Sequence, residues 1–188
     1  TRIDGHCAWV NKYAIKLANI DTSASIEGGT IINDCIFLDN AMDPIRNKIP
    51  NESHAMIKNW ILKACKYIIE RGITNVHDAW QSPEIINAML ELVEEKKLPI
   101  RCYGMIGASF TDYIKEFFEK GHHSGSRYRI RAVKAFIDGA LGSRGAALHD
   151  PYSDDPCNCG LILISKEEFD QLASLCHNYN FQLCTHAI

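Results

Sequence analysis

Apolar and polar positions follow two alternating rhythms from about residue 50 onward. Four short apolar runs are typical of strands: residues 73–79, 98–107, 128–139 and 181–188. Four longer segments have apolar residues at helical spacing: residues 52–72, 84–97, 110–121 and 166–180. Residues typical of helix starts precede or open three of these segments: Ser82-Pro83, Ser165 with Glu168, and either Asn51 or Ser53.

This alternation predicts an α/β fold with a parallel sheet and crossover helices. The pattern alone leaves two architectures open, a doubly wound sheet and a (β/α)8 TIM barrel. A complete barrel usually needs about 250 residues, whereas this chain has 188. A barrel built from this chain would therefore be incomplete.

The first 49 residues follow a different pattern. Helical spacing over residues 6–20 is followed by two short β-like runs, residues 30–32 and 35–38, which Asn33-Asp34 joins. We interpret residues 1–49 as a small α/β insert and residues 50–188 as the main domain.

Composition and charge narrow the classes of function. The net charge of -3, the pI of about 6.2 and the lack of a basic tract predict no nucleic-acid partner. No apolar run approaches the roughly 18 residues of a membrane span, and the chain opens on a polar segment rather than a signal peptide. The eight cysteines lie mostly in apolar segments, which favours buried free thiols. We therefore expect a cytoplasmic protein with no membrane partner.

The candidate chemistry lies where the predicted strands end. In both open architectures, active groups gather at the carboxyl ends of parallel strands. Three strand ends carry such groups: His77-Asp78, Lys134 followed by Asp138, and Thr185-His186. Neutral imidazoles are common metal ligands, so two histidines at equivalent strand ends favour a metal site over two unrelated core histidines.

Lys134 is unusual because it interrupts an apolar strand. The alternation of residues 131–136 places Ala132, Lys134 and Phe136 on one face. A lysine on an interior face costs several kcal/mol unless it is neutralised, paired or modified. Four interpretations remain open: an outward lysine on an edge strand, an amine of low pKa, a Schiff-base nucleophile, and a carbamate formed with CO₂ that could bind a metal.

A long irregular segment follows this strand, and no helical pattern resumes before about Ser165. Its glycines fit neither G-x-x-x-x-G-K-[ST] nor G-x-G-x-x-G, so a nucleotide site is not indicated. Arg144 could bind a carboxylate or carbonyl of a substrate, or lie on the surface.

Several segments together resemble a known family. "RIDGHCAWVN", "LDNAMD", "GITNVHDA", "VKAFIDGALGSRGAALHDPYSDDP" with "GLIL", and "FQLCTHAI" are similar, in order, to motifs of the amidohydrolase superfamily. The branch they resemble is the amidohydrolase-3 type, which includes N-substituted formamide deformylase-like enzymes. The resemblance covers essentially the whole chain, and its most specific part is the segment that begins at Lys134.

The resemblance implies a metal-dependent hydrolase on a (β/α)8 barrel that cleaves non-peptide C–N bonds in a small amide-type molecule. Members bind one or two divalent metals, usually zinc. Lys134 matches the family's carbamylated lysine, with the carbamate derived from CO₂, and His186 matches a histidine ligand. Four further residues lie in motifs of the branch and are expected to contact the substrate or to orient the metal ligands: His77, Asp78, Arg144 and His6.

The chain also departs from the family pattern. It contains no His-x-His, and it ends before the family's later histidine and aspartate ligands. We therefore interpret the chain as an internal fragment, with the insert at the barrel mouth followed by barrel strands two to five, and expect the fragment alone to be inactive. The alternative is a non-catalytic half-barrel, whose open sheet edges would favour a binding role or a homo-oligomer.

Overall fold

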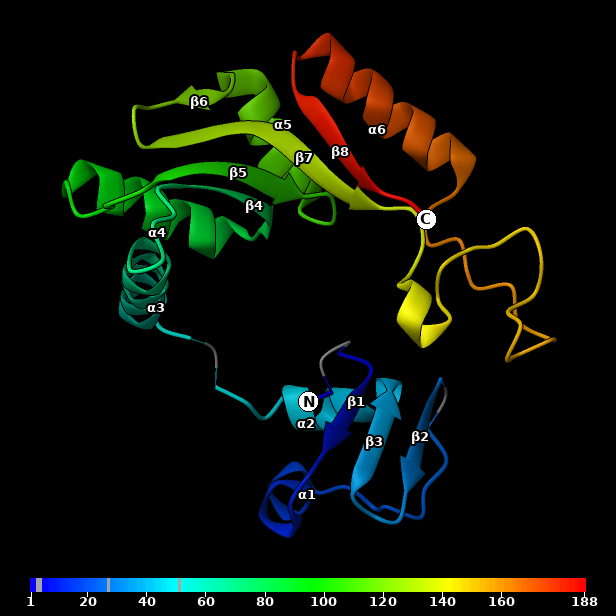
Figure 1. The fold of residues 1–188 in the computed structure, drawn as a ribbon. Coiled ribbons are helices and arrows are strands. Elements are labelled where there is room, and N and C mark those ends of the chain that lie inside the picture. The colour runs from blue at the N-terminus through cyan, green and yellow to red at the C-terminus, as the bar shows by residue number, and fades with distance from the viewer. Residues whose placement is uncertain (3–4, 27, 51) are drawn as a thin grey trace. The chain divides into compact units, whose positions relative to one another are not determined.

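The computed structural model describes residues 1–188 apart from residues 3, 4, 27 and 51, and divides into two compact units, residues 1–51 and 52–188 (Figure 1). Asn51, one of two predicted caps, thus lies outside the described residues. No helix in the described part of the chain is both long enough and apolar enough to cross a membrane.

The first unit is a three-stranded antiparallel sheet with short helices. Its elements are β1 (Cys7–Trp9), α1 (Lys12–Ala18), β2 (Gly29–Ile32), β3 (Ile36–Asp39), η1 (Asn40–Met42) and α2 (Asp43–Arg46), and the strand order is β1-β3-β2. The predicted turn between β2 and β3 is confirmed, because Asn33 and Asp34 have φ of 50° and 57°. Positive φ at both central residues is typical of a type I′ turn. Val10, Phe37, Ala41 and Met42 form the core of this unit.

The prediction of a helix from residue 6 is wrong at its beginning. Cys7–Trp9 is a strand that pairs with β3, and the helix starts at Lys12. Asn11 caps it, because its side chain accepts a hydrogen bond from the Ala14 amide at 2.9 Å. Helical spacing alone could not show this boundary, since β1 depends on pairing with a distant strand.

The second unit alternates strands and helices. Its elements are α3 (His54–Ile69), β4 (Asn75–Gln81), α4 (Pro83–Glu94), β5 (Arg101–Gly107), α5 (Thr111–Lys120), β6 (His123–Ser124), β7 (Tyr128–Phe136), η2 (Leu141–Ser143), α6 (Lys166–Asn178) and β8 (Gln182–His186). The predicted caps Ser53, Ser82 and Ser165 are confirmed, the last with Glu168 as a capping box.

The sheet of this unit is mixed and follows the order of the chain. β4, β5, β7 and β8 are parallel neighbours in that order, while the short strand β6, missed by the sequence analysis, pairs antiparallel with the first half of β7. A doubly wound sheet would reverse its strand order at one point, and this sheet does not.

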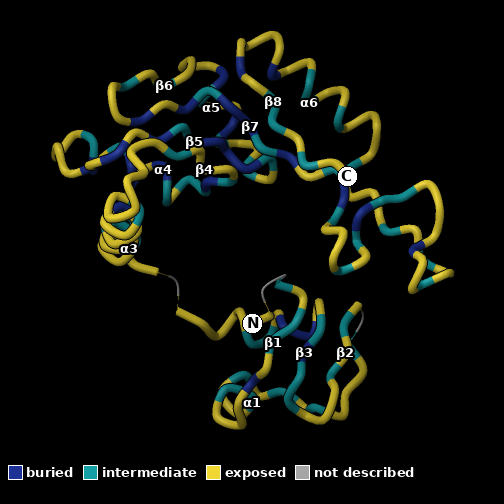
Figure 2. The backbone as a smooth tube through the Cα atoms, in the orientation of Figure 1, coloured by how far each residue is buried: buried dark blue, intermediate teal, exposed yellow. Residues whose placement is uncertain are grey.

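One face of the sheet packs against helices. Alternate strand residues, such as Ile106 on β5 and Val133 on β7, join Leu92 of α4, Phe118 of α5 and Cys176 of α6 in a single core. Figure 2 shows this buried layer as dark segments along β5 and β7. Residues of the opposite face are therefore the ones available to form a site at the strand ends.

Candidate active site

Lys134 and His186 lie on neighbouring strands and on the same face. In the register of β7 and β8, Lys134 pairs with Cys184 and Phe136 pairs with His186. Lys134 also pairs with Gly107 of β5 on its other side. Because Val133 points into the helix-facing core, Lys134 faces the opposite side, as the alternation predicts. The two residues therefore stand near the carboxyl ends of adjacent strands.

The ring of Phe136 lies beside both residues of this pair. The ring centroid of Phe136 lies 5.1 Å from that of Trp80 and 5.5 Å from that of His186. The Lys134 Nζ lies 4.8 Å from the centroid of Phe136, a cation–π contact. Among the described residues, Lys134 forms no ion pair with a carboxylate. The lysine thus stands beside apolar rings rather than beside a neutralising anion.

The backbone of Trp80 has an unusual conformation. It has a φ of 113°, and the register between β4 and β5 shifts between Ala79 and Gln81. A Cβ on Gly107 would lie 2.7 Å from the Trp80 ring, so the indole occupies the space that a side chain at residue 107 would fill. A non-glycine residue in such a conformation stores strain of about 1–3 kcal/mol and often marks a functional site. The strand predicted from the sequence stopped at residue 79, so Trp80 was not among the predicted site residues.

His186 is held by acceptors from the end of β7. Its Nε2 lies 3.1 Å from the Gly139 carbonyl oxygen and 3.5 Å from Asp138 Oδ1. Asp138 is 2% exposed, and its Oδ2 accepts hydrogen bonds from the amides of Ala147 and Ile188. The sequence placed Asp138 near this edge but gave no sign of these contacts.

Cys184, next to Lys134 in the register, is packed. Burial raises the pKa of the Cys184 thiol, and the charge of Lys134 acts in the opposite direction. A thiol held in its neutral form is a poor nucleophile. Cys184 therefore contributes packing rather than a nucleophile to this edge of the sheet.

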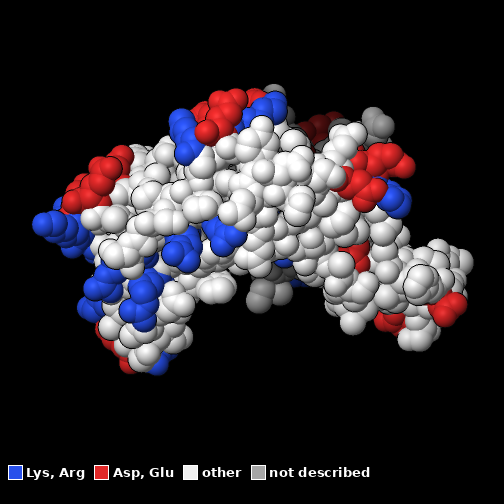
Figure 3. All heavy atoms as spheres, turned by 90° about the horizontal axis from the view of Figure 1, so that it is seen from above, with Lys and Arg blue, Asp and Glu red and all other residues white. Residues whose placement is uncertain are grey.

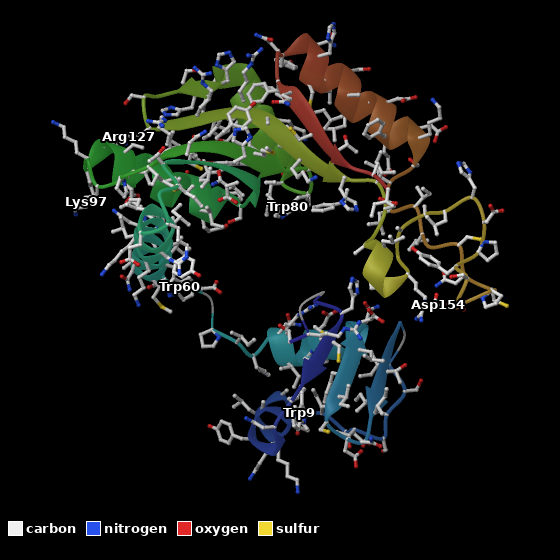
Figure 4. All side chains as sticks on the ribbon, viewed as in Figure 1. Trp9, Trp60, Trp80, Lys97, Arg127 and Asp154 are labelled. Carbon is white, nitrogen blue, oxygen red and sulfur yellow. The ribbon has the colours of Figure 1, made fainter. Side chains whose placement is uncertain are left out.

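Arg144 bonds within the segment that follows β7. Its Nε and Nη2 donate to the two carboxylate oxygens of Asp154 at 3.1 and 2.8 Å, and this pair lowers the pKa of Asp154. Asn158 donates to the Arg144 carbonyl, while Gly160 packs so closely on Ala146 that a Cβ would lie 1.9 Å from its carbonyl oxygen. Figure 4 shows Asp154 on this segment. Arg144 thus supports the segment itself, and its predicted contact with substrate stays a prediction.

The prediction that a strand ends at His77-Asp78 is wrong. β4 continues to Gln81, so both residues lie within it. His77 is level with Tyr103 and with Arg129, which lies at the beginning of β7, whereas Lys134 lies near the end of that strand. The structure therefore does not bring His77 to Lys134.

His77 instead lines a basic pocket at the other end of the sheet. Its ring lies 5.2 Å from that of Tyr103, and Arg101, Arg127 and Arg129 share a pocket of about 300 Å³ with it. Figure 4 shows Arg127 and Trp80 at opposite ends of the sheet. Figure 3 shows that Lys and Arg also gather in several further groups near Asp and Glu.

Asp78 lies on the helix-facing side, opposite to His77. Its Oδ2 accepts a hydrogen bond from Gln81 Nε2 at 2.7 Å, and Gln81 in turn accepts one from the Tyr128 hydroxyl. His6 belongs to the first unit, where its Nδ1 lies 2.9 Å from Asp39 Oδ1. The roles predicted for Asp78 and His6 stay predictions.

The residues at this edge fit part of a metal site. A neutral imidazole from His186 suits a divalent metal, and Lys134 would suit one only after conversion to a carbamate. Within the described ranges, no group of three or more His, Cys, Asp and Glu side chains could hold a metal ion. The described residues therefore offer one imidazole of the expected kind, that of His186, beside a lysine that would first need conversion, rather than a complete set of ligands.

Fold and site together define an α/β protein with a lysine–histidine pair at the carboxyl edge of a sequentially ordered sheet. The chain belongs to the amidohydrolase family, whose model matches residues 1–188. It is 28% identical over 207 residues to "Protein LONG AFTER FAR-RED 3" of Arabidopsis thaliana, and 27% identical over 199 residues to "Putative amidohydrolase YtcJ" of Bacillus subtilis (strain 168). All of this chain is covered in both matches, but only 35% and 37% of those relatives.

Two solved structures are also similar. Both are described as uncharacterized metal-dependent hydrolases, one from Pyrococcus horikoshii OT3 and one from Pyrococcus furiosus. Their TM-scores are 0.77 and 0.76, with 24% and 25% sequence identity. Each match covers 97% of this chain and 37% or 38% of the other chain. The likeness extends over both units of the present chain.

Proposed function

We propose that the protein to which this chain belongs is a metal-dependent hydrolase that cleaves a non-peptide C–N bond in a small amide or formamide. The observation that carries this proposal is the placement of Lys134 and His186 on one face at the ends of β7 and β8. Membership of the amidohydrolase family and the likeness to two solved metal-dependent hydrolases support it.

The parallel strands would form part of a closed (β/α)8 barrel. Consecutive parallel strands that stay neighbours, each joined by a crossover segment, suit a barrel better than a doubly wound sheet. In a barrel, the face that carries Lys134 and His186 would point inward, and its carboxyl edge is where active sites of this fold lie.

Lys134 would act as a carbamate. The unprotonated Nζ would attack the carbon of CO₂, a new N–C bond would form, and one proton would leave to solvent. The product carries a carboxylate-like group on a side chain that the Phe136 ring already orients. The conversion replaces an ammonium that lacks an anionic partner with a carboxylate-like anion, which a bound divalent metal would neutralise.

His186 and the aromatic rings would complete this chain's share of the site. His186 would offer its other ring nitrogen to the metal, since its Nε2 hydrogen-bonds to the Gly139 carbonyl and lies 3.5 Å from Asp138 Oδ1. Trp80 and Phe136 would limit the access of water to the Lys134 side chain. A bound divalent metal, zinc in the first instance, would supply polarisation of the substrate carbonyl and a water of lowered pKa.

The test uses the intact protein that contains this chain, supplied with zinc and ¹³C-bicarbonate. We expect a carbamate signal in the ¹³C NMR spectrum, bound zinc by mass spectrometry, and hydrolysis of some members of a panel of N-acyl and N-formyl amines. Lys134→Met should abolish the carbamate signal, lower the zinc content and reduce kcat/KM by about 100-fold or more, since a metal supplies several kcal/mol of transition-state stabilisation.

Lys115→Met is the matched control, because Lys115 is an exposed lysine paired with Asp112. It should leave zinc content and turnover unchanged. Full zinc content and turnover in Lys134→Met would contradict the proposal. We also expect the 188-residue chain alone to show no metal-dependent hydrolysis, because its described residues supply no complete set of metal ligands.

A binding or oligomerisation role is the second candidate. One observation favours it: β4 pairs only with β5 among the described strands, and an apolar pocket of about 210 Å³ lies beside it. An unpaired strand edge is a ready site for association. Sedimentation of the 188-residue chain would show a concentration-dependent dimer if this role holds, and a monomer at all concentrations would argue against it.

A further inference from the structure

The carboxylate of Asp138 is buried with one oxygen that lacks a hydrogen bond. The residue is 2% exposed, and Oδ1 is the atom without a partner among the described residues. Its Oδ2 is satisfied by two backbone amides, those of Ala147 at 3.0 Å and Ile188 at 3.3 Å. A buried oxygen left without a donor costs free energy and calls for an explanation. Nε2 of His186 lies 3.5 Å from this oxygen.

The surroundings of His186 distinguish its two ring nitrogens. Nε2 faces two oxygens, the Gly139 carbonyl at 3.1 Å and Asp138 Oδ1 at 3.5 Å. A carbonyl and an ionised carboxylate accept hydrogen bonds and donate none. Nε2 must therefore carry the ring proton. Nδ1 forms no hydrogen bond with any described residue, so it is the nitrogen with a free lone pair.

We propose that Asp138 is a positioning residue that holds His186 as the Nε2–H tautomer and leaves Nδ1 as the atom available to a metal. Only the part of this inference that concerns metal binding rests on the proposed function. The tautomer itself is a property of the chain. Carboxylates that orient metal-binding histidines in this way are a general device of metal sites.

Asp138 also connects this histidine to two segments of backbone. The Ala147 amide belongs to the irregular segment after β7, and the Ile188 amide follows β8. The Ile137 amide donates to the His186 carbonyl at 3.0 Å, so β7 and β8 are joined beside the ring on the main chain as well. The carboxylate therefore has a fixed position from which to set the orientation of the imidazole.

The first measurement needs no variant. A long-range ¹H–¹⁵N NMR spectrum of the ¹⁵N-histidine-labelled, metal-free chain, at a pH well above the ordinary histidine pKa of about 6.5, reports the tautomer of each ring. The His186 signals are assigned by their absence in His186→Gln. We expect a protonated Nε2 and an unprotonated Nδ1. A predominant Nδ1–H tautomer in the wild-type chain would overturn the proposal.

The second measurement replaces the acceptor. In Asp138→Asn, the amide oxygen can keep the two backbone hydrogen bonds, so the amide NH₂ then faces Nε2. A donor opposite a donor should shift the His186 ring towards the Nδ1–H tautomer, although the Gly139 carbonyl still favours the original one. Asp154→Asn is the matched control, because it changes a surface carboxylate of the same segment that pairs with Arg144. An unchanged His186 tautomer in a folded Asp138→Asn chain would assign the effect to Gly139 alone and would refute the role of Asp138.

Zinc affinity of the intact protein provides the link to function. Loss of a group that orients a metal-binding histidine typically weakens metal binding by about 10–100-fold, and we expect this for Asp138→Asn but not for Asp154→Asn. An intact protein that binds no zinc while its His186 shows the expected tautomer would refute the proposed metal site and leave the positioning role standing. Tight zinc binding by an intact protein whose His186 shows the Nδ1–H tautomer would refute the positioning role and leave the proposed metal site standing.

Discussion

At the scale of single residues, a buried network of hydrogen bonds explains why residue 104 of β5 is a glycine. Tyr128 donates to Gln81, and Gln81 donates to Asp78, with both Tyr128 and Gln81 fully buried. Burial and the coulombic effect of Cys102 and Asp78 raise the pKa of Tyr128, which keeps the hydroxyl a donor. Gly104 lies against this network, because a Cβ there would be 2.1 Å from Gln81 Oε1 and 2.8 Å from the Tyr128 hydroxyl.

Gly104→Ala should therefore destabilise the second unit. Neither neighbour can move away without breaking a buried hydrogen bond, and overpacking of this kind costs about 1–3 kcal/mol. Urea denaturation followed by circular dichroism would measure the change in the free energy of unfolding. Gly142→Ala is the matched control, since no atom lies within 4 Å of the added Cβ. Equal stability of the two variants would show that the network is not as rigid as its burial indicates.

Single residues also show why only part of the candidate site could be predicted from the sequence. Lys134 and His186 stand out in the sequence because a charged and a polar group interrupt or end apolar strands. Trp80 and Asp138 could not be recognised in this way. The place of Trp80 depends on a positive φ and on the absence of a side chain at Gly107, and that of Asp138 on amides from two separate segments.

At the scale of elements, charged groups connect α3 to α4. Lys58 of α3 forms ion pairs with Glu91 and Glu95 of α4 and its extension, the first at 3.1 Å. Hydrogen bonds from Lys58 and then Lys97 lower the pKa of Glu95 to about 2. The shift means that the folded state binds protons less readily than the unfolded state.

The ion pair between Lys58 and Glu95 should contribute to the free energy of unfolding only in a defined range of pH. Because the pKa of Glu95 is lower in the folded state, the contribution is present above about pH 4.5 and is lost as the pH falls towards 2. Glu95→Gln should therefore reduce the free energy of unfolding at pH 6. The difference from wild type should shrink as the pH is lowered, and urea titrations across that range would measure it. Glu116→Gln, which removes a surface pair within α5, is the control. A difference between wild type and Glu95→Gln that grows on acidification would contradict the assignment.

The sequence predicted those elements whose beginning is marked by residues close by in the chain. Ser53, Ser82 and Ser165 each bond to an amide three residues later, so the signal and its partner lie within one turn. β1 and β6 were missed because each is short and exists through pairing with a strand elsewhere, β3 and β7. Strand pairing of that kind leaves little trace in the local pattern of apolar residues.

At the scale of the whole molecule, the described residues form two hydrophobic clusters, one in each unit. One is built around Phe37 and Met42 within residues 1–51, and the other around Ile106 and Val133 within residues 52–188. The described residues of each core belong to one unit, so we expect the two cores to contribute independently to the free energy of unfolding. A core substitution in one unit should therefore leave the packing of the other intact.

Phe37→Ala tests this independence. Phe37 is fully buried, and a truncation of this kind costs about 3–5 kcal/mol. That cost is comparable with the whole stability of a unit of this size, so we expect the amides of β1 and β3 to lose protection from hydrogen exchange while those of β5 and β7 keep theirs. Ile106→Ala is the reciprocal variant and should lower protection in β5 and β7 alone. Loss of protection throughout the chain in either variant would show that the two cores unfold as one, and would contradict the independence of the two units.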